Sequence, residues 1–301
     1  MARLVIAIGG NAISDPSMHK KSSEFIGLQN VASEITNLYK KGNKIVVTHG
    51  NGPQVGSELE RNEVADRIPE LPLYLLTAET QAVIGSSIAK EIRNSGVPNV
   101  CAMLTHVLVN ENDPGFRNPT KPIGPFMERD GIKLACRRSG LKCRKFEKGF
   151  RLVVPSPEPI EIMEINNIDS VSKNSIAIAC GGGGIPVASS RNVYHGVNAV
   201  VDKDLCSSLL AIEIGADALI ILTDAEYVYS DYVNRSGPIR DISARLLGRS
   251  LERFEAGTMR PKIKACLDFV NSTGKPAYIG NILKLNEIIK HKSGTKIKAS
   301  D

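Results

Sequence analysis

Tryptophan is absent from the 301 residues of the chain, and aromatic residues together make up only 5%. Proteins that bind single-stranded nucleic acid stack bases on aromatic side chains, so this scarcity argues against such a platform. Long apolar runs are also missing. The stretch 209–222, for example, is interrupted by Glu213 and Asp217, whereas a membrane span needs ~20 apolar residues. The first apolar run, Leu4–Ile8, is too short for a signal peptide. We therefore expect a cytoplasmic protein that binds neither membranes nor nucleic acid.

The six cysteines form no Cys-x-x-Cys pair, and no histidine pair accompanies them at zinc-binding spacing. This pattern predicts reduced thiols and no metal site built from protein side chains. The composition, 42% hydrophobic and 23% charged, is that of a folded globular protein. The net charge of +6 suits an anionic ligand, although a small net charge also simply aids solubility.

Short apolar runs alternate with helical patterns along most of the chain. Such runs are typical of strands covered on both faces, and we expect them at Leu4–Ile8, Lys44–Thr48, Val100–Val109, Ile176–Ala179, Ala218–Leu222 and Pro276–Ile279. Apolar residues recur at helical spacing between the runs, at Phe25, Leu28, Val31, Ile35 and Leu38, at Ile84, Ile88 and Ile92, at Leu205, Leu209 and Ile212, and at Ile263, Cys266, Leu267 and Val270. The alternation predicts an α/β fold with a mainly parallel sheet and helices on both faces.

Residues 111–151 interrupt this rhythm. Four prolines lie between Asp113 and Phe126, and they restrict the backbone without making it helical. Nine basic residues follow between Arg129 and Arg151, against two acidic ones. We interpret the segment as an inserted subdomain over the main sheet, whose charge is either a solvated face or a lid that faces an anion.

Three of the predicted strands end in glycine-rich turns, at Gly9-Gly10-Asn11, at His49-Gly50-Asn51-Gly52-Pro53 and at Gly181–Gly184. Glycines let backbone N–H groups approach an anion closely, and ligands of open α/β sheets bind at the carboxyl ends of the strands. Three such turns on one sheet edge favour a shared cradle for phosphate or carboxylate. The sequence contains no Walker A motif and no match to the dinucleotide fingerprint.

Lysines lie where two of the predicted helices begin. Asp202-Lys203-Asp204 opens one helix and Met259-Arg260-Pro261-Lys262 opens another, with Pro261 suited to a first helical turn. Lys121 lies in the proline-rich stretch. Phosphoryl transfer depends on positive charge and alignment around the moving group, which these lysines could supply. Asp202 is either a plain helix N-cap or the partner of a lysine.

Eight motifs together resemble the carbamate kinases of the amino-acid-kinase family, nearly from end to end. They are Ala7–Ala12, Thr48–Gly56, Asn118–Phe126, Val154–Pro157, Gly181–Pro186, Val201–Leu205, Leu222–Asp224 and Met259-x-Pro261-Lys262. The resemblance implies an open αβα sandwich with a protruding lid subdomain, which works as a homodimer and transfers a phosphoryl group between ATP and carbamate by direct in-line attack. It implies an acceptor-binding lobe over residues 1–190, including the lid, and a nucleotide-binding lobe over 191–301, with ATP or ADP and Mg²⁺.

The resemblance also implies roles for individual residues. Lys121, Asp202, Lys203 and Lys262 would form the catalytic group, in which the lysines neutralise the phosphates and Asp202 orients them. The acceptor and the transferred phosphoryl group would lie against Gly9, Gly10, Asn11, Gly50, Asn51, Gly52, Gly181, Gly182 and Gly183. The nucleotide would lie near Asp224, Ala225, Tyr229, Met259 and Pro261.

Four positions depart from the family pattern. Ala82 and Ser86 stand where a glycine and a tyrosine are usual, Leu152 where a second arginine is common, and Arg260 where a glycine is frequent. These departures bear on the identity of the acceptor. Three alternatives stay open: a kinase of the same fold for another small carboxylate or phosphate, a non-catalytic anion or nucleotide sensor, and a nucleic-acid binder that uses the basic segment.

Overall fold

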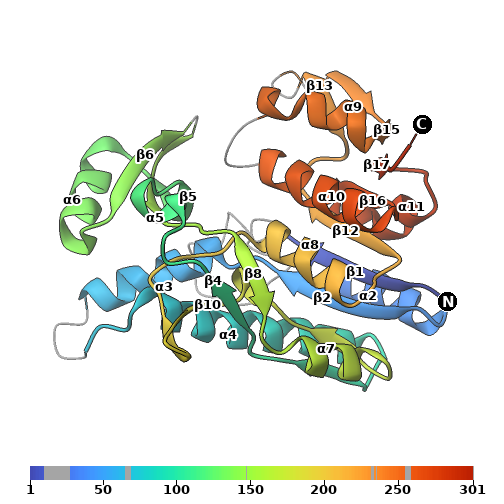
Figure 1. The fold of residues 1–301 in the computed structure, drawn as a ribbon, viewed down its shortest axis with the longest axis horizontal. Helices are drawn as coiled ribbons and strands as arrows, with labels where there is room; N and C mark the ends of the chain where they lie inside the picture. Colours follow the sequence, from blue (N-terminus) through green and yellow to red (C-terminus); the bar gives the residue numbers. More distant parts are fainter. Residues whose placement is uncertain are drawn as a thin grey trace.

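A central sheet carries the fold in the computed structural model, which describes residues 1–9, 28–64, 69–146, 148–231, 234, 236–254 and 259–300 (Figure 1). Within these residues the sheet has eight strands. Their order is β15 (Asp241–Ser243), β17 (Thr295–Lys298), β16 (Ala277–Asn281), β12 (Ala218–Thr223), β1 (Arg3–Ile8), β2 (Lys44–His49), β9 (Ile176–Ile178) and β3 (Val100–Ala102). All neighbours run parallel except β16 and β17, so the predicted mainly parallel sheet is confirmed.

Helices cover both faces of this sheet. Along β1, Val5 and Ala7 point into one core while Leu4, Ile6 and Ile8 point into the other, as the alternation of a strand requires. The first core contains α7 (Ile165–Ser172), α8 (Lys203–Glu213), α9 (Ala244–Arg249) and α10 (Met259–Thr273), and the second contains α2 (Leu28–Lys40), α4 (Leu73–Asn94) and α11 (Leu285–Ile289). The molecule is thus the predicted open αβα sandwich.

The two halves of the chain occupy the two halves of the sheet. Strands β1, β2, β9 and β3 come from the first 190 residues, and β12, β16, β17 and β15 come from the rest. The halves join where β1 pairs with β12, with Ile8 opposite Leu222. The residues that follow these two strands therefore leave the sheet side by side, at the boundary between the halves.

A basic subdomain stands off from the sheet, in green in Figure 1. It consists of an antiparallel sheet, β5 (Lys121–Met127), β7 (Gly149–Val154) and β6 (Lys142–Phe146), with α6 (Arg129–Ser139) against it; α5 (Pro114–Arg117) precedes it. Its sheet extends to Val154, slightly beyond the predicted limit. A second small sheet, β11 (Val193–Gly196), β10 (Ile185–Ser190), β4 (His106–Val109) and β8 (Pro159–Ile162), flanks it, and β13 (Val228–Asp231) pairs with β14 (Ser236–Ile239).

Helix α3 (Gly52–Val64) supports the base of this subdomain. A Cβ atom added at Gly56 would lie 2.0 Å from the Cα of Gly124 in β5. The helix and the strand therefore approach backbone to backbone, which only a glycine at position 56 allows. Gly56, the last residue of the Thr48–Gly56 motif, thus helps to determine where the subdomain lies.

Two predictions of secondary structure need correction. The run Val100–Val109 was predicted as one strand, but it forms β3 and β4, which belong to different sheets. The chain turns at Thr105, whose N–H donates to Oε1 of Gln81 (3.0 Å) and whose carbonyl accepts from Nε2 of Gln81 (3.2 Å). The side chain of Gln81 thus takes the place of a neighbouring strand of the central sheet as hydrogen-bond partner of the Thr105 backbone. The side chain of Gln81 comes from α4, which a local apolar pattern does not reveal.

The apolar face of α8 is also shifted from the prediction. Leu205, Leu209 and Ile212 pack against the core while partly exposed, whereas Cys206, Leu210 and Ala211 are fully buried. The predicted residue Phe25 lies outside the described residues. All six cysteines are described and none is in a disulfide. None of the helices in the described ranges is long and apolar enough to cross a membrane.

Candidate active site

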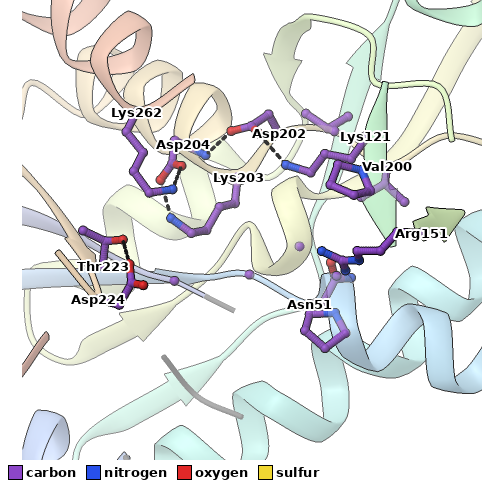
Figure 2. A pocket seen from close by; sticks show the side chains of 17 residues that line it. Asn51, Lys121, Arg151, Val200, Asp202, Lys203, Asp204, Thr223, Asp224 and Lys262 are labelled. Carbon is purple, nitrogen blue, oxygen red and sulfur yellow. Dashed lines mark hydrogen bonds and ion pairs between the residues drawn. The ribbon is translucent and has the colours of Figure 1, made fainter. Parts of the chain in front are cut away.

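One pocket lies at the carboxyl edge of the sheet, where the two halves of the chain meet beneath the basic subdomain (Figure 2). The turns that follow β1, β2 and β12 contribute to it, as do the starts of α8 and α10. Its lining in the described residues is Gly9, Gly50, Asn51, Gly52, Pro53, Lys121, Pro122, Arg151, Gly182, Val200, Val201, Asp202, Lys203, Asp204, Thr223, Asp224 and Lys262.

The pocket brings together most of the predicted site residues. All four predicted catalytic residues line it, together with Asp224 and five of the predicted turn residues, Gly9, Gly50, Asn51, Gly52 and Gly182. Gly181 and Gly183 do not line it: Gly181 faces His49, and Gly183 packs against the carbonyl of Val201. The predicted residues Gly10 and Asn11 lie outside the described residues.

The other residues predicted near a nucleotide lie beside the pocket rather than in its wall. Ala225 and Met259 are buried in the core next to it. Tyr229 is half-buried on β13. Its ring packs edge-to-face against that of Tyr227, with the ring centroids 6.2 Å apart. Pro261 lies in the first turn of α10, as expected of proline.

A buried carboxylate holds two of the lysines. Asp204, with 2% of its surface exposed, pairs through Oδ1 with Lys203 and through Oδ2 with Lys262 at 3.0 Å. Lys262 belongs to α10 and the other two residues to α8. One carboxylate therefore fixes two ammonium groups from different helices side by side at the edge of the pocket, as Figure 2 shows.

Asp202 combines both roles that the sequence left open for it. Its Oδ1 accepts a hydrogen bond from the N–H of Asp204 (2.9 Å), which caps α8. Its Oδ2 pairs with Lys121 of β5. The helix cap is therefore also the ionic contact between the sandwich and the basic subdomain.

Burial and charge act in opposite directions on these groups. Burial alone would raise the pKa of Asp204, but Lys203 and Lys262 hold that pKa well below its usual range. Burial lowers the pKa of Lys203 although Asp204 opposes the shift. Burial also lowers the pKa of Lys262, but the charges of Asp204 and Asp202 outweigh this effect, so its pKa lies above the usual value. Three lysines against two paired aspartates leave this cluster with a net positive charge, which suits an anion.

Two residues of the pocket, Asp204 and Arg151, could not be identified as site residues from the sequence. Asp204 stands in the Asp-Lys-Asp motif, but its contact with Lys262 spans 58 residues, and nothing in the motif reveals it. Arg151 appeared only as one member of the basic stretch, and the structure places it in the pocket wall. No group of three or more histidine, cysteine, aspartate or glutamate side chains suited to a metal occurs among the described residues.

A buried histidine supports the glycine turns from beneath. His49 is 1% exposed, and its Nδ1 donates to the carbonyl of Gly50 at 3.1 Å. Its ring lies so close to Gly181 that an added Cβ would be 2.4 Å from Nε2. Gln81 donates to the carbonyl of Gly181 (2.8 Å), and Asn51 donates to Oγ1 of Thr80 (2.9 Å). Side chains of α4 and β2 thus fix the turns of the pocket.

Lysines held by buried carboxylates beside glycine turns, on a mainly parallel αβα sheet, define a site for phosphorylated small molecules. The sequence matches the amino acid kinase family over residues 2–281, and the chain belongs to that family.

Its relatives within that family include curated carbamate kinases. That of Trichomonas vaginalis is 37% identical, over 98% of this chain and 99% of the relative, and that of Thermoplasma volcanium is 38% identical, over 99% of each. The structure of carbamate kinase from Giardia lamblia bound to AMP-PNP superposes with a TM-score of 0.87. Its sequence is 34% identical, and the match covers 100% of this chain and 99% of the Giardia chain. Chains at 14% identity, such as an isopentenyl phosphate kinase with a TM-score of 0.56, share the fold alone.

The buried histidine makes a pH-dependent contribution to stability. Burial lowers the pKa of His49 from 6.5 to about 4. Between these values the unfolded chain binds a proton that the folded chain does not, so the free energy of unfolding decreases as the pH falls through this window. The decrease amounts to about 3 kcal/mol, and the contribution is fully present above pH 6.5.

The His49→Asn variant cannot titrate in this range, although its amide can donate to Gly50 as the imidazole does. We expect denaturant unfolding between pH 7 and pH 4 to show a smaller loss of stability for the variant than for the natural chain. Identical pH dependence in both proteins would contradict the assignment of the shift to His49.

Proposed function

We propose that this chain is a carbamate kinase, which transfers a phosphoryl group reversibly between ATP and carbamate. The observation that carries the proposal is the pair of lysines on Asp204, at the junction of the two halves of the sheet. Identities of 34–38% to curated carbamate kinases over nearly the full length support it. The AMP-PNP-bound relative supports ATP as the phosphoryl donor.

Each lysine has a role in this reaction. Lys203 and Lys262 neutralise the phosphoryl group as it moves, and Lys121 approaches from the lid, which is the basic subdomain of residues 121–154. In-line transfer needs alignment and positive charge rather than a covalent intermediate. The backbone N–H groups of the turns at Gly9, Gly50–Gly52 and Gly182 suit the acceptor and the transferred phosphoryl oxygens.

We assign the acceptor to the lobe of residues 1–190 and the nucleotide to residues 191–301. The side chains beside the pocket that suit a nucleotide, around Asp224, Tyr229 and the start of α10, all come from the second half. The turns after β1 and β2 come from the first half. In-line transfer between ligands of the two lobes occurs where β1 and β12 meet, which is where the lysines lie.

Mg²⁺ is a proposed companion of the nucleotide. This ion is usually bound through substrate phosphates, waters and one or two carboxylates. Asp224 suits that role, since it lines the pocket, forms no ion pair with any described residue, and accepts a hydrogen bond from Thr223 at 3.0 Å. When bound, the ion would neutralise phosphate charge, while the lysines and glycine turns of this chain orient the reacting groups.

The four departures from the family pattern support carbamate as the acceptor, because none of them lines the pocket. Ala82 and Ser86 line a separate cavity behind His49. Leu152 is buried in the core of the lid. Arg260 donates to the carbonyls of Phe254 (3.0 Å) and Glu252 (2.9 Å).

We also propose that the chain forms a homodimer through α4 and the edge strand β3. Val83 and Leu104 are 57% and 53% exposed, and the cavity beside them is lined by Ala82, Gly85, Ser86, Ala102, Met103 and Leu104 among others. Apolar side chains next to an unpaired strand edge are features that proteins normally cover. A second copy of the chain suits this surface by symmetry.

The lysine pair provides the direct test of the proposed reaction, assayed as ATP formed from carbamoyl phosphate and Mg-ADP. Lys203→Ala and Lys262→Ala each remove one electrostatic contact to the phosphoryl group, and we expect turnover to fall ~100-fold or more with the fold retained. Lys264→Ala is the matched control, because this lysine lies on α10 but pairs with the exposed Glu158. Near-normal turnover in both site variants would contradict the assignment.

The dimer is tested by a charge placed on the proposed interface. We expect light scattering to give a dimer mass for the natural chain and a monomer mass for Leu104→Glu, because an interface cannot bury an unpaired carboxylate cheaply. Leu246→Glu is the control, since this leucine is 45% exposed on α9. A monomeric natural chain, or a dimer unaffected by the change at Leu104, would overturn this surface.

A further inference from the structure

Arg151 is directed into the pocket by the alternation of its strand. Along β7, Leu152 and Val154 pack into the lid core with Ile123 and Ile132, so Arg151 lies on the opposite face of the strand. This face lines the pocket. Figure 2 shows the guanidinium beside Asn51, across the pocket from the two lysines on Asp204.

The guanidinium is held in place but not neutralised. Its Cζ lies 5.2 Å from the centre of the Phe126 ring, in a cation–π contact. Its Nε is buried and donates to no group in the described part of the chain. Burial lowers the pKa of Arg151 to about 10, so the side chain still carries its charge at neutral pH.

The other cations of the pocket all have carboxylate partners. Lys121 pairs with Asp202, and Lys203 and Lys262 pair with Asp204. Among the described residues, no aspartate or glutamate forms a salt bridge with Arg151. Arg151 is half-buried, and its buried Nε–H stays without an acceptor, which is costly unless an anion binds the guanidinium. The missing partner is thus a ligand with acceptor oxygens.

We propose that Arg151 binds the carboxylate oxygens of the carbamate acceptor and so determines which acceptors the enzyme accepts. A guanidinium is planar and donates two parallel N–H bonds, which match a carboxylate better than an ammonium group does. Arg151 lies with the turn at Asn51, on the acceptor side of the pocket, and not with Thr223 and Asp224. The inference rests on the proposed carbamate kinase activity and deepens it.

The proposed contact gives the lid a second cation with an anionic partner in the pocket. Arg151 and Lys121 both come from the lid, on neighbouring strands β7 and β5. Lys121 already reaches Asp202, whereas Arg151 gains its anion only when acceptor is present.

The test uses the full chain in the ATP-consuming direction, with ammonium carbamate as the acceptor and ADP release as the readout. For Arg151→Gln we expect the KM for carbamate to rise ~10- to 100-fold, as for loss of a hydrogen-bonded charged partner. The KM for ATP should stay within about twofold, because the residue contacts only the acceptor. Arg151→Lys keeps the charge but lacks the planar guanidinium. Its KM for carbamate should lie between those of the natural chain and Arg151→Gln.

Arg144→Gln is the matched control. Arg144 is the register partner of Arg151 on β6, but it is exposed and donates to Asn118 at 2.8 Å. The Arg144→Gln substitution removes one positive charge from the same subdomain, as Arg151→Gln does, and should leave the KM for carbamate unchanged. An equal rise in this control would reduce the effect to general electrostatics and overturn the proposal.

Two further outcomes separate the inference from the function on which it rests. A natural chain that releases no ADP with carbamate contradicts the proposed function itself. An active natural chain together with an Arg151→Gln variant of unchanged carbamate KM, or with an equal rise in the KM for ATP, overturns the role of Arg151 alone. Retained ATP saturation in Arg151→Lys shows that the variant site is folded.

Discussion

The buried carboxylate of Asp204 is the group on which the site depends. Moving a carboxylate and two ammonium groups out of water costs several kcal/mol for each ion, and only close pairing offsets this cost. Asp204 provides the pairing for Lys203 of its own helix and Lys262 of α10. The same contact therefore joins two helices and places two positive charges at the mouth of the pocket. Removing one partner of such a pair typically costs about 3–5 kcal/mol.

The lid is coupled to this centre by contacts of different kinds. Gly56 allows α3 to approach the backbone of β5 at Gly124, and this steric contact positions the base of the lid. Lys121 reaches Asp202, which is also the N-cap of the helix that carries Asp204. Lys121 therefore links the lid directly to the start of α8. The proposed acceptor contact of Arg151 adds a link that exists only with ligand bound.

Local patterns were sufficient for the layers of the fold and for the glycine turns and lysines that line the pocket. Strands buried on both faces are nearly continuous apolar runs, so β1, β2 and β12 could be predicted from such runs in the sequence. The turns after β1 and β2 could be placed together because parallel strands share a carboxyl edge.

Contacts between distant residues could not be predicted from the residues alone. The break between β3 and β4 depends on Gln81 from α4, and the pairing of Asp204 with Lys262 joins two helices 58 residues apart. Arg151 is one of nine basic residues in its segment, and only the register of β7 directs it into the pocket. Each of these depends on how separate elements pack.

Asp204 keeps the two lysines charged within a buried site. The most direct test of this role is the pH profile of turnover for Asp204→Asn, measured as ATP formation beside the natural chain. Without the carboxylate, burial and mutual repulsion lower the pKa of Lys203 further. We expect the alkaline limb to move about one pH unit or more toward neutrality, with lower maximal turnover. An alkaline limb at the same pH in both proteins would contradict this role.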